Sequence, residues 1–330
     1  MENLNRRKFS AATLALLASA QPAFAQTGSR GGTARLFCGF PPGDAADLVA
    51  RMYAEKLRAA FPQGLIVENR PGAGGRTALD LFRREAADGY NLLLTPSSML
   101  TLAPHAVKGL AYDPLKDYAP ISRACSNAFA LSVGPMVPES VKTLAQFLAW
   151  CQANPSLANY GTSGVGTTMH LLGANFARLS KVSLNMIPYK GGGPAATDLV
   201  GGQVASVMST LPGVMEFAKG GRVRILAVSS ESRWPTLPDV PTFAESGYPD
   251  LTVVQWFGFV APAGTPAEVL DRLNAQIRQI ARMPDVVKSL EMLGLAPSVS
   301  ASPREFSQDI RNEHERWRGV VQAIGFKAEG

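Results

Sequence analysis

The sequence predicts an α/β protein of two domains with a ligand cleft between them. Its 330 residues correspond to roughly two domains of average size. Short apolar runs typical of buried strands alternate with helical patterns, an order that favours parallel sheets covered by helices. The chain completes one such block, builds a second, and returns with a further apolar strand. We therefore expect domain 1 to comprise residues 26–125 and 235–330, and domain 2 to comprise residues 126–234.

Domain 1 begins with three predicted strands separated by two helices. The strands are residues 33–40, 65–68 and 91–95. Helices at residues 44–61 and 76–87 lie between them, which gives a β-α-β-α-β order. In the first helix, apolar residues near one face are expected to cover the sheet. These residues are Leu48, Met52, Leu57 and Phe61.

The middle of the chain repeats this alternation, and two amphipathic helices close it. The predicted strands are residues 129–133, 159–161, 184–188, 204–209, 223–228 and 256–260. The predicted helices are residues 143–153, 168–180, 195–200, 266–282 and 303–324. Strand 256–260 is expected to rejoin the first sheet. Strand ends and helix N-termini then converge in the cleft, where a ligand is expected.

The first 25 residues have the features of a cleavable signal peptide. A basic segment at residues 6–8 precedes an apolar run at 11–20, which is too short to span a bilayer comfortably, and residues 23–25 read Ala-Phe-Ala. Cleavage is expected after Ala25, and the mature protein is expected in the periplasm. The paired arginines resemble the twin-arginine export signal. Ser10 stands where that signal usually has leucine, so the Sec route stays open beside the twin-arginine route.

Composition and charge exclude several classes of protein. With 46% hydrophobic and 18% charged residues, the chain is not disordered, collagen-like or a coiled coil. A mean hydropathy of +0.04, with no long apolar run after the N-terminus, excludes a polytopic membrane protein. Removing residues 1–25 lowers the formal net charge from +6 to +4, which suits small anionic ligands. Basic residues do not cluster among aromatic ones, so no nucleic-acid partner is expected.

The three cysteines form no metal or redox motif. Cys38, Cys125 and Cys151 lack CxxC spacing, and the chain has three histidines, so neither a zinc site nor another cofactor is expected. In an oxidising compartment one cysteine pair can form a disulfide and leave the third thiol free. The sequence does not determine which pair that is.

A glycine-containing turn follows the first predicted strand. Phe40 leads through two prolines to Gly43, Asp44, Ala45 and Asp47 at the start of a helix. Glycine permits close approach of a ligand, and the amides of a helix N-terminus attract anions. The same residues are typical of an ordinary turn with an aspartate N-cap. Both interpretations stay open at this point.

Three glycines and four hydroxyl residues precede the helix predicted at 168–180, and together they can surround a carboxylate without a fixed positive charge. The stretch lacks the ending of a nucleotide P-loop and the dinucleotide fingerprint. In the alternative interpretation, Thr167 or Thr168 is an ordinary N-cap and His170 packs in the first helical turn. The candidate binding residues here are Thr162, Ser163, Gly166, Thr167, Thr168 and His170.

Two further turns can contribute to the cleft. After the strand predicted at 184–188, Tyr189 can donate a hydrogen bond and Gly191 can approach a ligand closely. Ser97 and Ser98, after the third strand, can add two hydroxyls. The glycine-rich residues 70–75 are adequately explained as a turn that begins a helix.

Eight motifs, taken in order, resemble those of one protein family. They are PPGDAADLVAR, VENRPGAGGRTA, ADGYNLLLTPSS, YDPLKDYAPIS, YGTSGVGTTMHLLG, PYKGGGPAATDLVGGQV, LPDVPTFAESGYP and WFGFVAPAGTPAEVLDRLN. As a set they resemble the Bug family of periplasmic substrate-binding proteins, the receptors of tripartite tricarboxylate transporters, over essentially the whole mature chain. The resemblance implies a two-domain fold like that of type II periplasmic binding proteins. Such a protein closes around a small organic acid, held by amides, hydroxyls and water rather than by a salt bridge.

The resemblance also implies which residues contact the ligand. They are Phe40, Gly43, Ala45, Asp47, Thr162, Ser163, Gly166, Thr167, Thr168, His170, Tyr189 and Gly191. Two departures bear on the ligand. Asp44 stands where the family usually has a small residue, and it should repel an acid unless it faces solvent or pairs with an ammonium group. Ser209 and Thr210 replace the Asp-Asn of the family's Asp-Asn-Leu-Pro motif. Asp44 and Ser209 are therefore counted as candidate site residues, and the identity of the acid stays open.

The main hypothesis is a monomeric periplasmic receptor without catalytic activity. It would capture a mono-, di- or tricarboxylate, with or without an amine, and deliver it to membrane transporter components or a sensor protein. The alternative is an exported α/β hydrolase, which needs a nucleophile, a base and an acid within reach. No GxSxG motif occurs, and Ser163 with His170 is the one suggestive pair. A signalling protein without a small ligand would leave the glycine and hydroxyl turns without a role.

Overall fold

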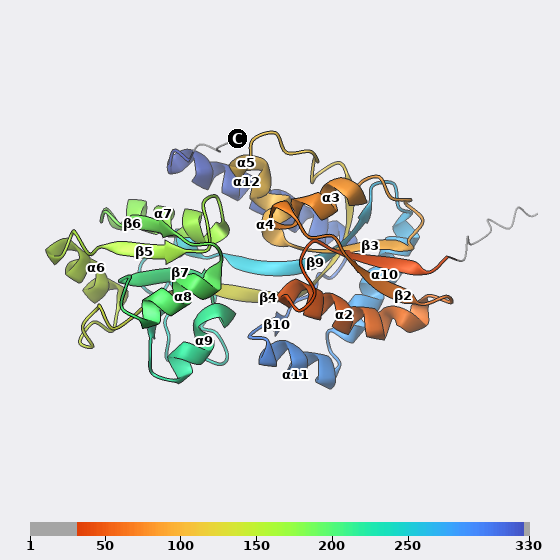
Figure 1. Cartoon of the computed structure of the whole chain (residues 1–330). Coiled ribbons are helices and arrows are strands. Elements are labelled where there is room, and N and C mark those ends of the chain that lie inside the picture. Colours follow the sequence, from red (N-terminus) through yellow and green to blue (C-terminus); the bar gives the residue numbers. More distant parts are fainter. Residues whose placement is uncertain (1–31, 327–330) are drawn as a thin grey trace, which may run out of the picture. The chain divides into compact units, whose positions relative to one another are not determined.

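Ten strands among residues 32–326, the part of the chain that the computed structural model describes, form one sheet (Figure 1); eight follow the order β2-β1-β3-β9-β4-β7-β5-β6, and β8 and β10 pair with β4 beside this path. The predicted signal peptide and its cleavage site after Ala25 lie outside these residues. The strands are β1 (Ala34–Cys38), β2 (Leu65–Asn69), β3 (Asn91–Pro96), β4 (Tyr118–Val133), β5 (Asn159–Thr162), β6 (Asn185–Pro188), β7 (Ser206–Thr210), β8 (Arg224–Val228), β9 (Val254–Pro262) and β10 (Ala296–Pro297).

Helices follow most strands, as the alternating pattern predicts. They are α2 (Ala45–Leu57), α3 (Arg76–Phe82), α4 (Ser97–Thr101), α5 (Ala103–Ala106), α6 (Leu144–Ala153), α7 (Thr168–Ser180), α8 (Gly192–Val200), α9 (Pro212–Lys219), α10 (Ala267–Ile280), α11 (Pro284–Met292) and α12 (Pro303–Ala323). Three short 3-10 helices add η1 (Arg58–Ala60), η2 (Ala73–Gly75) and η3 (Pro249–Leu251).

The sheet has two parts that share the long strand β4. In the first, called sheet A, β1 lies parallel to β2 and β3, and β9 is antiparallel to both β3 and residues 118–128 of β4, with β10 at the edge. In the second, called sheet B, β5 lies parallel to β6 and β7, while β7 and β8 are antiparallel to β4. The parallel pairings and the return of a late strand to the first sheet are confirmed.

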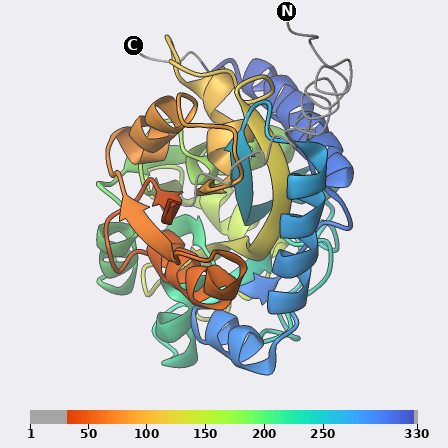
Figure 2. The same cartoon turned by 90° about the vertical axis from the view of Figure 1, so that its right-hand side faces the viewer.

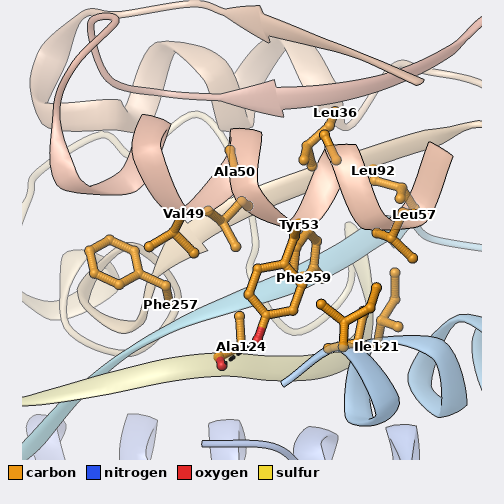
Figure 3. Packing of buried hydrophobic residues seen from close by; sticks show 14 of the residues in the cluster. Leu36, Val49, Ala50, Tyr53, Leu57, Leu92, Ile121, Ala124, Phe257 and Phe259 are labelled. Carbon is orange, nitrogen blue, oxygen red and sulfur yellow. Dashed lines mark hydrogen bonds between the residues drawn. The ribbon is translucent and has the colours of Figure 1, made fainter. Parts of the chain in front are cut away.

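Helix α2 covers sheet A through one aromatic and several small side chains (Figure 3). Tyr53 is fully buried, and its hydroxyl donates a 2.7 Å hydrogen bond to the carbonyl oxygen of Ala124 on β4. Burying a side chain of this size contributes roughly 2–3 kcal/mol. The predicted face was partly wrong, because Leu48 is 39% exposed while Ala46 and Ala50 are buried. The buried face of α2 therefore combines alanines, which let the helix approach the sheet closely, with Val49, Tyr53 and Leu57.

The two sheets have separate cores, and α12 reaches both. Phe306 and Ile310, in its first half, pack in the core of sheet A, whereas Trp317 and Val321, in its second half, pack in that of sheet B. In Figure 2, α10 (blue) lies beside α2 (orange-red), and α10 contacts both α2 and β4. The two sheets are therefore linked by β4 and α12.

The three cysteines are buried and unbridged. Cys38 lies on β1, Cys125 on β4 and Cys151 on α6. Burial raises the pKa of Cys38 to about 11 and that of Cys151 to about 12. The pair that the sequence left open is thus not joined in this structure, and thiols of such high pKa are unreactive.

Candidate functional site

The turn between β1 and α2 is closed by its own carboxylates. Gly43 has a φ of 87°, a conformation that favours glycine. Asp44 is the N-cap of α2, and its exposed carboxylate accepts a 3.0 Å hydrogen bond from the amide of Ala46. Ala45 follows as the first helical residue. This end of the helix is therefore capped by a charge of the chain itself.

Asp47 holds the same turn from inside. It is 1% exposed and accepts hydrogen bonds from the Gly43 amide (2.9 Å), Asn69 Nδ2 (2.8 Å) and Arg51 Nε (2.9 Å). Burial alone would raise the pKa of Asp47, but the bonds from Arg51, Asn69 and Gly43 outweigh it and lower the pKa below 3.8. The carboxylate is thus fully engaged in organising the turn.

The turn between β5 and α7 is organised by a hydroxyl. Gly164 and Gly166 have φ values of 143° and 73°. Thr167 is the N-cap of α7, and its Oγ1 accepts from the amide of His170 (3.3 Å) and donates to the carbonyl oxygen of Gly164 (2.8 Å). Thr162 Oγ1 lies 3.4 Å from the same hydroxyl. The helix predicted at 168–180 has these bounds in the structure.

His170 fixes this turn from within the helix. Its Nδ1 accepts a 3.0 Å hydrogen bond from the amide of Gly166. Its ring packs edge-on against that of Phe326, with 5.4 Å between the ring centroids. Burial lowers the pKa of His170 below 6.5, which keeps the imidazole neutral and able to accept. Ser163 makes no hydrogen bond to His170 among the described residues, so the suggestive pair for a hydrolase is not assembled.

The third turn precedes α8. The hydroxyl of Tyr189 donates a 2.8 Å hydrogen bond to Asp198 Oδ2, and its ring lies against Gly161. Gly191 is the N-cap of α8 and has a φ of 109°. A Cβ atom added to Gly191 would have no other atom within 4 Å. Tyr189 is thus occupied within its own half of the fold, whereas Gly191 is open.

A cavity of about 460 Å³ lies where turns from both sheets meet. This volume is in the range of small-molecule sites. Sheet A contributes the ends of β1 and β3, the turn before α3, helices α4 and α5, and β9, while sheet B contributes the turn before α7. Its lining residues are Phe40, Gly74, Arg76, Pro96, Ser98, Met99, Leu102, Ala103, Ala106, Val107, Val165, Gly166, Thr167, Thr168, Met169, Gln255 and Phe326.

Five candidate residues from the sequence are brought together here: Phe40, Ser98, Gly166, Thr167 and Thr168. The others lie outside the lining, namely Gly43, Asp44, Ala45, Asp47, Ser97, Thr162, Ser163, His170, Tyr189, Gly191 and Ser209. Ser209 is buried on β7, and its hydroxyl has no partner among the described residues. Ligand contact by any of these residues stays a prediction.

The sequence interpretation missed several lining residues. Arg76 follows the glycine-rich turn that was explained as the start of a helix, so a basic residue directly after glycines was its one available signal. Gln255, on β9, and Phe326, after α12, reach the cavity through tertiary packing, and no local pattern marks them.

A second cavity, of about 520 Å³, has a different character. It lies along α12 and β9, and most of its charged side chains already have partners. Arg123 Nη2 lies 2.8 Å from Asp309 Oδ2, and Trp256 Nε1 donates a 2.7 Å hydrogen bond to Glu313 Oε2. None of the candidate residues lines it. This second cavity is the larger of the two, but the 460 Å³ cavity is lined by five of the candidate residues and is therefore the better candidate for a binding site. It is called the inter-sheet cavity below.

Residues 32–326 contain no group of three or more His, Cys, Asp or Glu side chains placed to hold a metal ion. No helix in this part of the chain is long and apolar enough to cross a membrane.

Comparison with known proteins decides the family. A family model described as the tripartite tricarboxylate transporter family receptor matches residues 49–326. The chain belongs to this family. BugT of Bordetella pertussis is 36% identical over 289 residues, which cover 87% of this chain and 88% of BugT. The expected Bug-type identity is therefore confirmed.

Two solved structures share the fold. One, from R. palustris with adipate, is 29% identical with a TM-score of 0.77, over 89% of this chain and 97% of that one. MatC from Rhodopseudomonas palustris with bound malate is 28% identical with a TM-score of 0.73, over 88% and 98%. The two-domain periplasmic-binding-protein fold is confirmed. The family consists of periplasmic receptors rather than enzymes, which gives the hydrolase alternative no support.

Proposed function

We propose that this receptor captures a small organic carboxylate in the inter-sheet cavity and delivers it to membrane components of a tripartite tricarboxylate-type transporter or to a sensor protein. The observation that carries the proposal is the chemistry of the cavity wall. The N-terminus of α7 and the hydroxyls of Ser98 and Thr168 line it, and no acidic side chain does so among the described residues.

The start of α7 is suited to a carboxylate. Thr167 satisfies the amide of His170, whereas the first amides of a helix have no partner within it and carry partial positive charge. Thr168 is the first helical residue, and its hydroxyl has no hydrogen bond among the described residues. Two amides and a hydroxyl therefore remain for ligand oxygens.

The relatives support the class of ligand. Adipate and malate are the acids named for the two R. palustris structures, and both are dicarboxylates. The departures at Asp44 and Ser209 leave a choice among mono-, di- and tricarboxylates, with or without an amine.

The linkage of the two sheets supports closure on binding. A ligand that touches turns from both sheets favours the closed arrangement in proportion to those contacts. We place the domain boundaries at residues 26–125 with 235–330 and at residues 126–234. The passage of β4 from sheet A to sheet B at residues 128–129 supports the boundary between residues 125 and 126. We propose further that the mature protein is a monomer, cleaved after Ala25 and exported by the Sec or the twin-arginine route.

The decisive experiment is calorimetric titration of the mature protein with malate, adipate and benzoate, and with adipamide as a neutral control. We expect at least one acid to bind and adipamide not to bind. A ligand at one hundred times its Kd should also raise the unfolding free energy by about 2.7 kcal/mol. Binding of adipamide as tight as that of adipate would contradict a carboxylate site.

A matched pair of variants tests the place of binding. Thr167→Val and Thr143→Val each remove a threonine N-cap, of α7 and α6 respectively, so each should lose about 1 kcal/mol of stability. Affinity for the best acid should fall about tenfold in Thr167→Val, because the turn loses its organising hydroxyl. It should be unchanged in Thr143→Val. Equal affinities in the two variants would remove the α7 turn from the site.

A further inference from the structure

We infer that Arg76 determines ligand specificity by pairing with a second anionic group, so that the inter-sheet cavity selects a diacid with an apolar body. This inference rests on the proposed function and deepens it. It begins from charge: Arg76 is the sole ionisable side chain among the described residues that line the cavity.

The guanidinium group of Arg76 lies at the cavity wall. A Cβ built on Gly74, itself a lining residue, would lie 3.7 Å from Arg76 Nη1. Arg76 is partly buried, and within residues 32–326 it has no hydrogen bond or ion pair. A partly buried guanidinium with five donors and no acceptor is an incomplete arrangement.

Neighbouring arginines of sheet A show the contrast. Arg51 is paired with Asp47 at 2.9 Å, Arg83 with Asp80 at 2.9 Å, and Arg70 with Glu68. Each of these cations is neutralised by an acid of the chain. Arg76 therefore differs from them in facing a cavity without an acid.

Helix stability does not explain Arg76. It is the first residue of α3, whose N-cap is Gly75 and whose first turn has no acidic residue. A cation in the first turn of a helix opposes the helix dipole and is mildly destabilising. Removing the charge should therefore leave α3 intact.

The rest of the wall describes the ligand. Between Arg76 on the side of sheet A and the α7 turn on the side of sheet B, the lining is mainly apolar, with Phe40, Met99, Leu102, Val165 and Phe326 among it. The two anion-binding features therefore belong to different sheets and are separated by hydrocarbon. An acid with carboxylates at two ends and an apolar body satisfies both features, and it would connect the two sheets.

A monoacid satisfies one of these features and leaves the other without a partner. Because arginine–carboxylate hydrogen bonds are among the stronger ones, the preference for a diacid should be about tenfold at this partly exposed site.

The test uses two pairs of acids with matched skeletons, adipate with hexanoate and terephthalate with benzoate, titrated by calorimetry at fixed salt. The wild-type protein should bind the better diacid about tenfold more tightly than its monoacid. Arg76→Met should abolish that ratio while keeping monoacid affinity, and Arg76→Lys should restore part of it. Arg272→Met, which removes an exposed arginine of α10 away from the cavity, should keep the wild-type ratio.

The outcomes separate the two levels of the argument. A diacid preference that is undiminished in Arg76→Met overturns the role of Arg76 and leaves the carboxylate receptor standing. Equal affinity of wild-type protein for diacid and monoacid also overturns it. Failure of every acid to bind the wild-type protein removes the proposed function, and this inference with it.

Discussion

The β1–α2 turn and the β5–α7 turn have the same position in the two sheets but opposite chemistry. Each joins the end of a parallel strand to a helix, and each contains a glycine with positive φ. In the first turn, the carboxylates of Asp44 and Asp47 accept the free amides. In the second, Thr167 and His170 do this with neutral groups.

The difference shows when a glycine turn at a helix start is available to an anion. A turn that carries its own carboxylate has already filled the anion site with a side chain, and it would repel a second negative charge. A turn closed by a hydroxyl and an imidazole has the same shape without the charge. Phe40 is accordingly the one residue of the first turn that lines the inter-sheet cavity, whereas the second turn contributes residues 165–169.

The largest expected effect is that of removing the internal charge of the first turn. Asp47→Asn places an amide where three donors converge, so the free energy of unfolding should fall by about 3 kcal/mol. Chemical denaturation measures this. Asp271→Asn, at an exposed position of α10, is the control and should change stability by less than about 0.5 kcal/mol.

The same carboxylate predicts a pH dependence at the acidic end. Because the pKa of Asp47 lies below 3.8 in the folded protein, its stabilising contribution is present above pH 3.8 and is lost as the pH falls through the native pKa. Asp47→Asn should lack this part of the acid transition. A loss below 1 kcal/mol at pH 7 would show that Asp47 does not organise the turn.

An intermediate effect is expected from titration of the second turn. The pKa of His170 is lowered by burial, so stability is retained above pH 6.5 and falls as the pH drops below it, where the unfolded chain takes up the proton first. Loss of the bond from the Gly166 amide corresponds to about 1 kcal/mol. The melting temperature measured between pH 7.5 and 5.5 should therefore decline.

His170→Asn sharpens this test, because its Oδ1 can accept from Gly166 without titrating. The decline in melting temperature should be smaller in this variant. His105, whose pKa is also lowered, first by burial and then by the nearby charge of His314, contributes with the same sign. His105→Asn therefore measures the part of the decline in melting temperature that His105 causes. A pH profile identical to that of the wild type in His170→Asn would exclude a pH-sensitive turn.

The smallest effect is expected at Asp44. Asp44→Ser keeps an N-cap acceptor and removes a charge that is exposed and outside the cavity lining. Screening by water and salt limits the gain in affinity for adipate to about twofold, and 1 M NaCl should erase it in a calorimetric titration. Weaker binding would instead mean that Asp44 touches the ligand, as it would if the ligand carried an ammonium group.

Much of the fold could be predicted from local sequence patterns, and the errors of that prediction have physical causes. β1 and β3 are short, mainly apolar runs in the buried part of sheet A, and α7 begins after its N-cap threonine. Residues 118–128 of β4 escaped prediction because Pro120, Ser122 and Arg123 interrupt the apolar pattern, and the register with β9 shifts twice along this stretch. Pairing across bulges leaves no regular period in the sequence.

The candidate site was predictable as far as single turns reach. Glycines and hydroxyls before α7 signal a helix start open to a ligand, and Thr168 now lines the cavity. Gln255 comes from β9 and Phe326 from the segment after α12, both far along the chain, so tertiary packing alone brings them to the cavity. Arg76 lay beside a recognised glycine turn, but its lack of a partner is visible only when the surrounding acids are placed.

The pairing of β9 with both β3 and β4 sets the order in which the chain can fold. Sheet A contains β1 to β3 from the first hundred residues, yet it lacks its central antiparallel strand until residues 254–262 have been synthesised. Contacts between such distant segments slow folding. In the interval the apolar strand β3 stays without its final neighbour β9, which makes the nascent chain a natural client for chaperones.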